Sequence, residues 1–269
     1  MTGSDLSFRL KAIADMVPPG MCVYDVGCDH AFLSIYLVKH GGAEGAVASD
    51  VNPGPLKAAA EHVAAEGLED KIRIVLSDGL HNIEKPDRPA VLIIAGMGGP
   101  LILDILRESP EVVSAFEQII ISPQSRIEDV RAYVPKLGLM ITDEVMVRDA
   151  DKYYTIIKFV HNRREEPKSG AVHTEPGTGA YGQTDPGWDD CLGDMAVHAY
   201  DLYGYKLMSS ADPVLMDYLK WEHGVLEGVR SELKDQAHSG RYREVTEDIR
   251  LNELIYKRME GIRYGYDHN

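Results

Sequence analysis

The residues best suited to chemistry stand together in segment 25–31, Asp-Val-Gly-Cys-Asp-His-Ala. A short apolar run precedes Asp25, a glycine turn follows at Gly27, and an apolar segment begins at Ala31. This order predicts a strand, a turn and a helix, whose first backbone N–H groups can meet a ligand. Within the turn, Cys28 and His30 are residue types whose side chains more often pack against neighbours than take part in catalysis.

The acid at position 29 narrows the class of ligand. Nucleotide-binding turns of this kind follow acid-x-Gly-x-Gly-x-Gly, and here Asp29 and Ala31 replace the second and third glycines. A carboxylate at the point of closest approach would repel the pyrophosphate of NAD. It suits a cofactor without phosphate and with a positive charge, such as S-adenosylmethionine. The turn therefore predicts a methyltransferase, in which Asp29 either holds the cofactor's sulfonium end or accepts a hydrogen bond from the methylated base.

Further acids follow the next two predicted strands. Asp50 stands at the distance from the first turn at which an acid binds ribose hydroxyls. It could instead cap the next helix, a role that Asn52 can fill. Asp78 and Gly79 follow the third strand, where a carboxylate can accept the adenine amine's hydrogens, although Asp-Gly is also a common turn. We predict that Asp25, Asp50 and Asp78 form one nucleoside site.

Two more loops complete the expected site. Residues 95–99, Ala-Gly-Met-Gly-Gly, hold three glycines in four positions, which lets the backbone approach a ligand closely. A tight turn alone would need only one of them. The loop should face both the methyl donor and the acceptor. Residues 122–124, Ser-Pro-Gln, follow the next strand and either line the acceptor pocket or form a simple turn.

A parallel sheet must position these loops. Continuous apolar runs are typical of strands buried on both faces, with helices on each side. The predicted strands are 21–26, 45–49, 72–76, 90–95 and 118–122, and the predicted helices are 31–40, 55–66, 101–108 and 126–137. Runs 139–147 and 153–160 predict an antiparallel pair that finishes the sheet. The fold class is therefore α/β, a Rossmann-like methyltransferase sheet with helices on both faces.

The rest of the chain predicts two further parts. Residues 161–190 are rich in Pro, Gly, Thr and charge, which indicates a flexible insertion or linker. Beyond Pro213, apolar residues recur in steps of three and four over two stretches separated by residues 238–240. They predict an antiparallel helical hairpin, or coiled coil. The expected division is a methyltransferase domain at 1–160, a linker at 161–199 and the hairpin at 200–269.

Composition limits the partners and the compartment. A formal net charge of −15 is unfavourable for binding nucleic acid, unless local cations at 158–168 or 241–263 meet the phosphates. The second group mixes six Lys or Arg with five acids, so it could equally be a solvated helix face. Three scattered cysteines indicate a reducing compartment, and no Cys/His spacing resembles a zinc site. We expect a cytoplasmic protein without metal, signal peptide or membrane span.

Several motifs together resemble the bacterial tRNA adenine-N1 methyltransferase family that modifies position 22 of tRNA. They lie at 25–31, 48–56, 77–80, 94–99 and 152–154, and Leu6-Ser-Phe-Arg9-Leu is similar to that family's opening segment. The resemblance covers about residues 5–160, and the hairpin resembles the family's coiled-coil appendage. The chain departs from the family by having Cys28 in place of Ser, Ser122-Pro-Gln124 in place of Gln-Pro-Asn, and a longer 161–190 insertion.

The resemblance implies S-adenosylmethionine as cofactor, tRNA as partner, and a set of site residues. The catalytic residues would be Asp29 and His30. The cofactor-binding residues would be Asp25, Gly27, Cys28, Asp50, Val51, Asn52, Asp78, Gly79, Ala95, Gly96, Met97 and Gly98. The substrate-binding residues would be Arg9, Gly99, Ser122, Pro123, Gln124 and Tyr154. The acidic charge leaves two alternatives open: a methyltransferase for a small molecule or protein, and a non-enzymatic binding module with a relic pocket.

Overall fold

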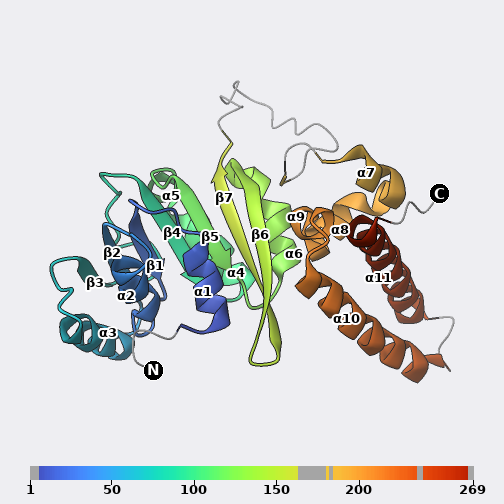
Figure 1. The fold of residues 1–269 in the computed structure, drawn as a ribbon, viewed down its shortest axis with the longest axis horizontal. Coiled ribbons are helices and arrows are strands. Elements are labelled where there is room, and N and C mark those ends of the chain that lie inside the picture. Colours follow the sequence, from blue (N-terminus) through green and yellow to red (C-terminus); the bar gives the residue numbers. More distant parts are fainter. Residues whose placement is uncertain (1–5, 163–179, 182–183, 235–238, 266–269) are drawn as a thin grey trace. The chain divides into compact units, whose positions relative to one another are not determined.

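The computed structural model describes residues 6–162, 180–181, 184–234 and 239–265 (Figure 1). The chain divides into two compact units. The first unit holds the described residues up to 181, and the second holds those from 184 onward. Each unit is described below by itself.

A seven-stranded sheet forms the centre of the first unit, in the order β3-β2-β1-β4-β5-β7-β6. Its strands are β1 (Cys22–Val26), β2 (Gly45–Asp50), β3 (Ile72–Leu76), β4 (Ala90–Ala95), β5 (Gln118–Ser122), β6 (Leu139–Asp149) and β7 (Lys152–His161). The first five strands run parallel, and β7 is antiparallel to both β5 and β6. The order reverses between β1 and β4, which creates a switch point where ligands bind in such sheets. The predicted sheet and its antiparallel finish are confirmed.

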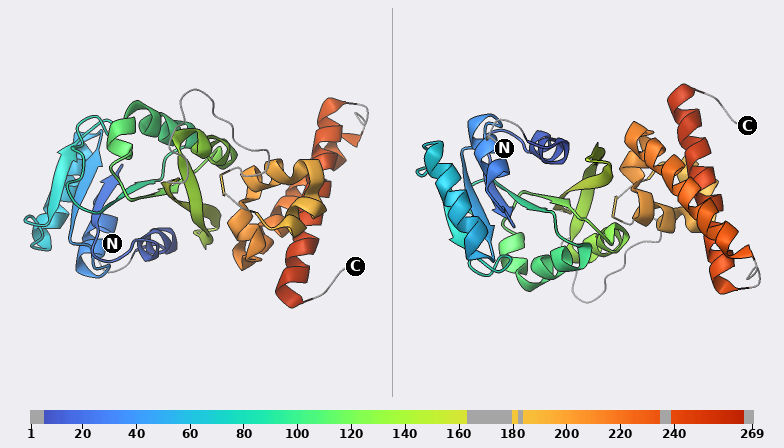
Figure 2. Two further views of the ribbon diagram at one scale, coloured as in Figure 1. Left: turned by 90° about the horizontal axis from the view of Figure 1, so that it is seen from above. Right: turned by 90° about the horizontal axis from the view of Figure 1, so that it is seen from below.

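Helices cover both faces of this sheet (Figure 2). They are α1 (Phe8–Asp15), α2 (Phe32–Lys39), α3 (Pro53–Ala65), α4 (Gly99–Glu108), α5 (Pro110–Val113) and α6 (Ile127–Tyr133), followed by a 3₁₀ turn, η1 (Val134–Leu137). Every side chain from Ala90 to Ile94 in β4 is fully buried. Such a strand needs helices on both sides, because neither of its faces can meet water.

Three helical segments of this unit differ from the prediction, and one of them is α5, a four-residue helix that was not predicted. Helix α1 was not expected, because its eight residues carry little apolar periodicity. Its first turn is capped by Ser7, whose hydroxyl accepts a hydrogen bond from the Leu10 amide at 3.3 Å. The single helix predicted at 126–137 divides into α6 and η1. Pro135 lies at this division, and it lacks the N–H that an α-helix interior requires.

The second unit begins earlier in the chain than predicted. It contains α7 (Pro186–Leu192), a 3₁₀ turn η2 (Gly193–Met195), α8 (Ala196–Tyr203), α9 (Tyr205–Ser209), α10 (Pro213–Glu232) and α11 (Gly240–Tyr264). The linker predicted at 161–199 is therefore wrong for its last part. Trp188, at 1% exposure, and the buried Leu192 and Ala199 give α7 and α8 a core of their own. Residues 163–179 and 182–183 lie outside the described residues.

Helices α10 and α11 form the predicted hairpin, side by side within their unit (Figure 1). Its seam buries Leu215, Leu219, Val245, Ile249 and Met259. Residues 226–233 are only half-buried or exposed, so the apolar contact is concentrated near the α9 end of α10. Among the described helices, none combines the length and the apolar character needed to cross a bilayer.

Candidate active site

A cavity of about 480 Å³ opens at the carboxyl ends of the parallel strands, beside the switch point. Its size is within the range of small-molecule sites, roughly 300–1,000 Å³. It is lined by Arg9, Val26, Gly27, Asp29, Asp50, Val51, Asn52, Pro55, Ser77, Asp78, Gly79, Ala95, Gly96, Met97, Leu101, Ile105 and Gln124. Most of the residues predicted from the sequence are thus brought together in one cavity. Those outside its lining are Asp25, Cys28, His30, Gly98, Gly99, Ser122, Pro123 and Tyr154.

The turn after β1 has a strained, alternating backbone. Gly27, Asp29 and Ala31 have φ angles of +76°, +52° and +59°. All three positions thus have the conformation for which the nucleotide-binding pattern uses glycine. Holding a non-glycine residue there costs on the order of 1–3 kcal/mol, which the surrounding structure must offset. The Asp29 side chain is 74% exposed and lines the cavity, so its carboxylate can reach a bound ligand.

Gly27 is needed for its backbone angle, and it also lies against the flexible end of the Met97 side chain. A Cβ atom added there would lie 2.3 Å from Cε of Met97. The backbone N–H groups of Gly27 and Cys28 both donate to the carbonyl oxygen of Ser49, at 2.8 and 2.9 Å. These bonds hold the turn against the end of β2.

Asp25 lies beneath this turn and does not line the cavity. It is 4% exposed, and its Oδ2 accepts a hydrogen bond from the Ser34 hydroxyl at 2.8 Å. Burial raises the pKa of the Asp25 carboxyl to about 6, the Ser34 hydrogen bond opposes this rise, and the charge of Asp50 adds to it. The Asp25–Ser34 pair ties the end of β1 to the first turn of α2.

Asp50 and Asp78 line the cavity from the ends of β2 and β3. One oxygen of Asp50, Oδ1, accepts from the backbone N–H of Asn52 at 2.8 Å. Asn52 is at the N-cap position of α3, but its side chain makes no capping bond, so the predicted Asn52 cap is absent. The loop that carries Asp78 is held by Ser77, whose hydroxyl donates to the Gly79 carbonyl and accepts from the Asn82 amide.

The loops after β4 and β5 are joined by backbone hydrogen bonds. The N–H of Gln124 donates to the Met97 carbonyl at 2.9 Å, and that of Gly96 donates to the Ser122 carbonyl at 3.2 Å. Gly96, with φ of +82°, and Gln124 line the cavity. Ser122 is fully buried below them. A Cβ on Gly99 would lie 2.6 Å from the Arg126 carbonyl, so this glycine allows close packing of the two loops.

Arg9 reaches the cavity from the first turn of α1. Its backbone N–H donates to Oδ2 of Asp149 at 3.2 Å, and its guanidinium lies 5.1 Å from the ring centroid of Tyr154. Both partners lie in the β6–β7 hairpin, so the antiparallel end of the sheet positions this arginine. Tyr154 contacts Arg9 and so supports it, but Tyr154 does not itself line the cavity.

His30 and Cys28 belong to the turn, but neither lines the cavity. The His30 ring lies 5.7 Å from His62 and 5.8 Å from Phe32, centroid to centroid, and its Nε2 is 3.5 Å from Oδ1 of Asp29. Burial, followed by the charges of Asp25 and Asp50, raises the pKa of the Cys28 thiol well above its usual range. This cysteine therefore remains a thiol, which suits packing better than nucleophilic chemistry.

The prediction missed part of the apolar lining. Leu101 and Ile105 are one helical turn apart in α4, and Leu101 stays 51% exposed beside the 55% exposed Val51. Exposed aliphatic side chains in a cavity can contact the faces of a planar ring. The four-residue spacing in α4 is the only sequence signal for this pair, and it is equally typical of core packing.

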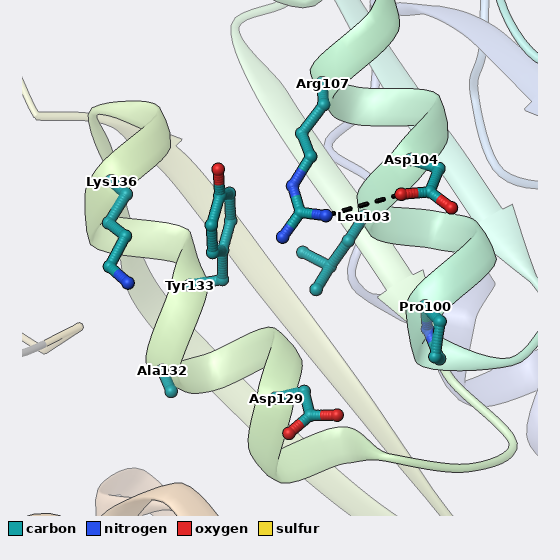
Figure 3. A pocket seen from close by; sticks show the side chains of 8 residues that line it. All are labelled: Pro100, Leu103, Asp104, Arg107, Asp129, Ala132, Tyr133 and Lys136. Carbon is teal, nitrogen blue, oxygen red and sulfur yellow. Dashed lines mark hydrogen bonds and ion pairs between the residues drawn. The ribbon is translucent and has the colours of Figure 1, made fainter.

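A second hollow, of about 340 Å³, lies between α4 and α6 (Figure 3). Here the Tyr133 ring lies between Arg107, whose guanidinium is 3.8 Å from its centroid, and Lys136, whose Nζ is 5.2 Å away. Arg107 also pairs with Asp104 at 3.3 Å. None of the predicted site residues lines this hollow, so the strand-end cavity is the candidate active site.

The fold and the cavity together define a class. A parallel sheet with an antiparallel end, and acids at successive strand ends around a nucleoside-sized cavity, is typical of Rossmann-like methyltransferases. Residues 6–157 match the family described as methyltransferase domain, and the chain belongs to this family. Among the described residues, no group of three or more His, Cys, Asp or Glu side chains is arranged to hold a metal ion.

Individual relatives are more specific. Over 152 residues the chain is 34% identical to a tRNA (adenine(22)-N(1))-methyltransferase of Bacillus subtilis, a match that covers 56% of this chain and 63% of that relative. A crystal structure of a candidate tRNA (m1A22) methyltransferase from Streptococcus pneumoniae superposes with a TM-score of 0.77 at 26% identity, covering 94% of this chain and all of that one. A second structure of the Streptococcus protein, in complex with S-adenosyl-L-methionine, superposes with a TM-score of 0.74 at 27% identity. This match covers 94% of this chain and all of that one.

Proposed function

We propose that this chain transfers a methyl group from S-adenosylmethionine to N1 of adenine 22 in tRNA. The observation that carries the proposal is the strand-end cavity, where Asp29, Asp50 and Asp78 supply carboxylates and Asp29 replaces a phosphate-binding glycine. The Bacillus subtilis relative and the structures from Streptococcus pneumoniae support it.

The lining residues fit S-adenosylmethionine. Asp50 retains a second carboxylate oxygen that can accept hydrogen bonds from ribose hydroxyls. Val51 and Leu101 offer apolar surface to the adenine ring, and Asp78 can accept hydrogen bonds from its amine. The Met97 loop remains for the methionine end. When bound, the cofactor supplies an electrophilic methyl group on a positively charged sulfur.

The acceptor base needs little acid–base chemistry from the protein. Adenine N1 carries a lone pair in the ring plane, so no proton has to be removed before it reacts. The protein must instead admit an unpaired or flipped base, orient N1, and stabilise the positive charge that the ring gains. Asp29 is the residue for the last task, because an exposed carboxylate beside the methyl donor can accept a hydrogen bond from the adenine amine. Gln124, in the loop after β5, can orient the base.

Binding of tRNA must rely on local cations, because the formal net charge is −15. We assign this contact to Arg9, to Lys158 in β7 and to the Lys and Arg residues of α11. Arg163, Arg164 and Lys168 belong to the same predicted group and lie outside the described residues. A tRNA substrate also implies that the protein works in the cytoplasm.

The acidic charge favours one rival, a methyltransferase for a small molecule or protein. Two binding measurements separate the alternatives. Calorimetry with S-adenosylmethionine should give a saturable heat, and its absence would point to a binding module with a relic pocket. A gel shift with unmodified tRNA should show a complex that weakens as salt rises. If the protein bound the cofactor but not tRNA, the rival would be favoured.

A further inference from the structure

Among the described residues that line the strand-end cavity, Arg9 is the single cationic side chain. The other charged residues of this lining are Asp29, Asp50 and Asp78. The cavity thus has a positive position in an otherwise acidic wall. The proposed cofactor explains the acids but gives no reason for the arginine.

The arginine lies toward one end of the cavity. The ends of β2 and β3 carry Asp50 and Asp78, whereas Arg9 lies with the loops of β4 and β5. The distance from its Nη1 to the position of a Cβ built on Gly96 is 3.5 Å, and Nε2 of Gln124 is 3.7 Å from the same point. Strand order therefore separates this guanidinium from the ribose and adenine side of the site, and places it on the acceptor side.

Part of the guanidinium lacks a partner. Nη1 of Arg9 is buried and makes no hydrogen bond with any described residue. No described carboxylate comes within ion-pairing distance of the side chain, and Asp149 binds the backbone N–H instead. A buried donor without an acceptor is costly, and an arginine prefers an oxyanion. Its ring contact with Tyr154 fixes the side chain but accepts no N–H.

The chemistry of the acceptor indicates which oxyanion Arg9 would bind. Methylation gives the adenine ring a positive charge, so a guanidinium on the base edge would oppose the reaction. The phosphates on either side of the target nucleoside carry the oxygens that arginine binds best. We propose that Arg9 binds a backbone phosphate that flanks the target adenosine, and thereby positions the nucleotide in the cavity. This inference rests on tRNA being the substrate.

The test pairs a protein change with a phosphate change. Unmodified tRNA is assembled with an uncharged methylphosphonate in the linkage 5′ or 3′ of adenosine 22, and kcat/KM is measured with the full-length wild-type protein and with Arg9→Gln. For one of the two linkages, the wild type should lose about tenfold or more, and Arg9→Gln should show little further loss on that RNA. With normal tRNA, Arg9→Gln should also lower the salt slope of binding by roughly one unit.

Three controls keep the outcomes distinct. Arg88→Gln removes the same charge at the opposite end of the strands, where Arg88 pairs with Asp87, and should behave as the wild type. Arg9→Lys keeps a cation and should remain sensitive to the neutral linkage. Affinity for S-adenosylmethionine should not change in Arg9→Gln. Equal losses for Arg9→Gln and the wild type on both neutral linkages would overturn the assignment. Failure of the wild type to methylate normal tRNA would overturn the proposed function itself.

Discussion

Asp29 is the residue on which the chemistry depends most. Its φ of +52° and its exposed carboxylate place a charge where nucleotide-binding turns have glycine. Asp29→Ala should lower kcat by about 10- to 100-fold, the equivalent of one charge-assisted hydrogen bond, with a smaller change in cofactor affinity. Methyl transfer and calorimetric titration would measure the two effects.

Asp50→Asn is the variant to compare with Asp29→Ala. It retains an oxygen for the Asn52 amide, removes the charge offered to ribose, and should weaken cofactor binding more than it lowers kcat. Equal losses of affinity and kcat in Asp29→Ala would instead make Asp29 a cofactor ligand.

Asp25 should make stability depend on pH in an unusual direction. Its pKa is raised to about 6 in the folded state from an ordinary 3.8, so the folded protein holds the proton more tightly than the unfolded chain. Its stabilising contribution is complete below about pH 4 and is lost as pH rises through about 6. The loss is on the order of 3 kcal/mol.

Asp25→Asn removes this dependence and keeps an oxygen that can accept from Ser34. With no cofactor bound, the free energy of unfolding of the variant minus that of the wild type should be larger at pH 7.5 than at pH 4.5. Urea unfolding at the two pH values would measure this difference. If the difference in free energy of unfolding between wild type and variant did not change with pH, a raised pKa of Asp25 would be contradicted.

The sequence could predict the acids and the turn, because strand ends and glycine positions are set by local spacing. It could not predict the Asp25–Ser34 bond or the lining by Leu101, since both depend on how a helix is rotated against the sheet. The Asn52 side chain makes no capping bond, and Pro53 and Pro55, at the first and third positions of α3, have no N–H that could donate to it.

At the scale of elements, the hairpin contains a polar layer within its apolar seam. Glu222 accepts hydrogen bonds from the hydroxyls of Tyr203 and Tyr218, at 2.7 and 2.8 Å, and from Nδ2 of Asn252 at 2.9 Å. Asn252 also donates to the Leu219 carbonyl at 3.0 Å. Such a layer fixes the register of two helices, because any shift leaves buried polar groups unpaired.

Glu222→Ala should therefore destabilise the second unit. Removing one acceptor leaves the groups of Tyr203, Tyr218 and Asn252 that donate to it without that partner, at a cost of about 1–3 kcal/mol. Thermal or urea unfolding followed by circular dichroism would measure the change. Glu232→Ala, at the exposed end of α10, serves as control and should have little effect. Equal stability of the two variants would show that the layer contributes nothing.

The strands of the parallel sheet were predicted within a residue, because buried parallel strands read as continuous apolar runs. Helices α7 and α8 were missed, because short segments around Trp188 and Tyr200 carry no long periodicity and form only against their neighbours. Tertiary burial, rather than local propensity, decides such elements.

For the whole molecule, the division into two units suggests a division of labour. All the cavity-lining residues belong to the first unit, whereas the cations of α11 belong to the second. A chain truncated after residue 182 should keep its affinity for S-adenosylmethionine and lose most of its affinity for tRNA. Calorimetry and gel shifts would test this. If the truncated chain bound and methylated tRNA as well as the full chain, the hairpin would serve another purpose.

Methylation at a defined position of tRNA tests the proposed activity itself. Full-length protein, S-adenosylmethionine and an unmodified tRNA transcript are incubated, and the nucleosides are analysed by mass spectrometry. A transcript with guanosine at position 22 serves as the matched substrate. We expect 1-methyladenosine in the first transcript and none in the second. If the protein bound the cofactor yet yielded no 1-methyladenosine, or yielded it equally from both transcripts, methyl transfer to N1 of adenine 22 would be contradicted.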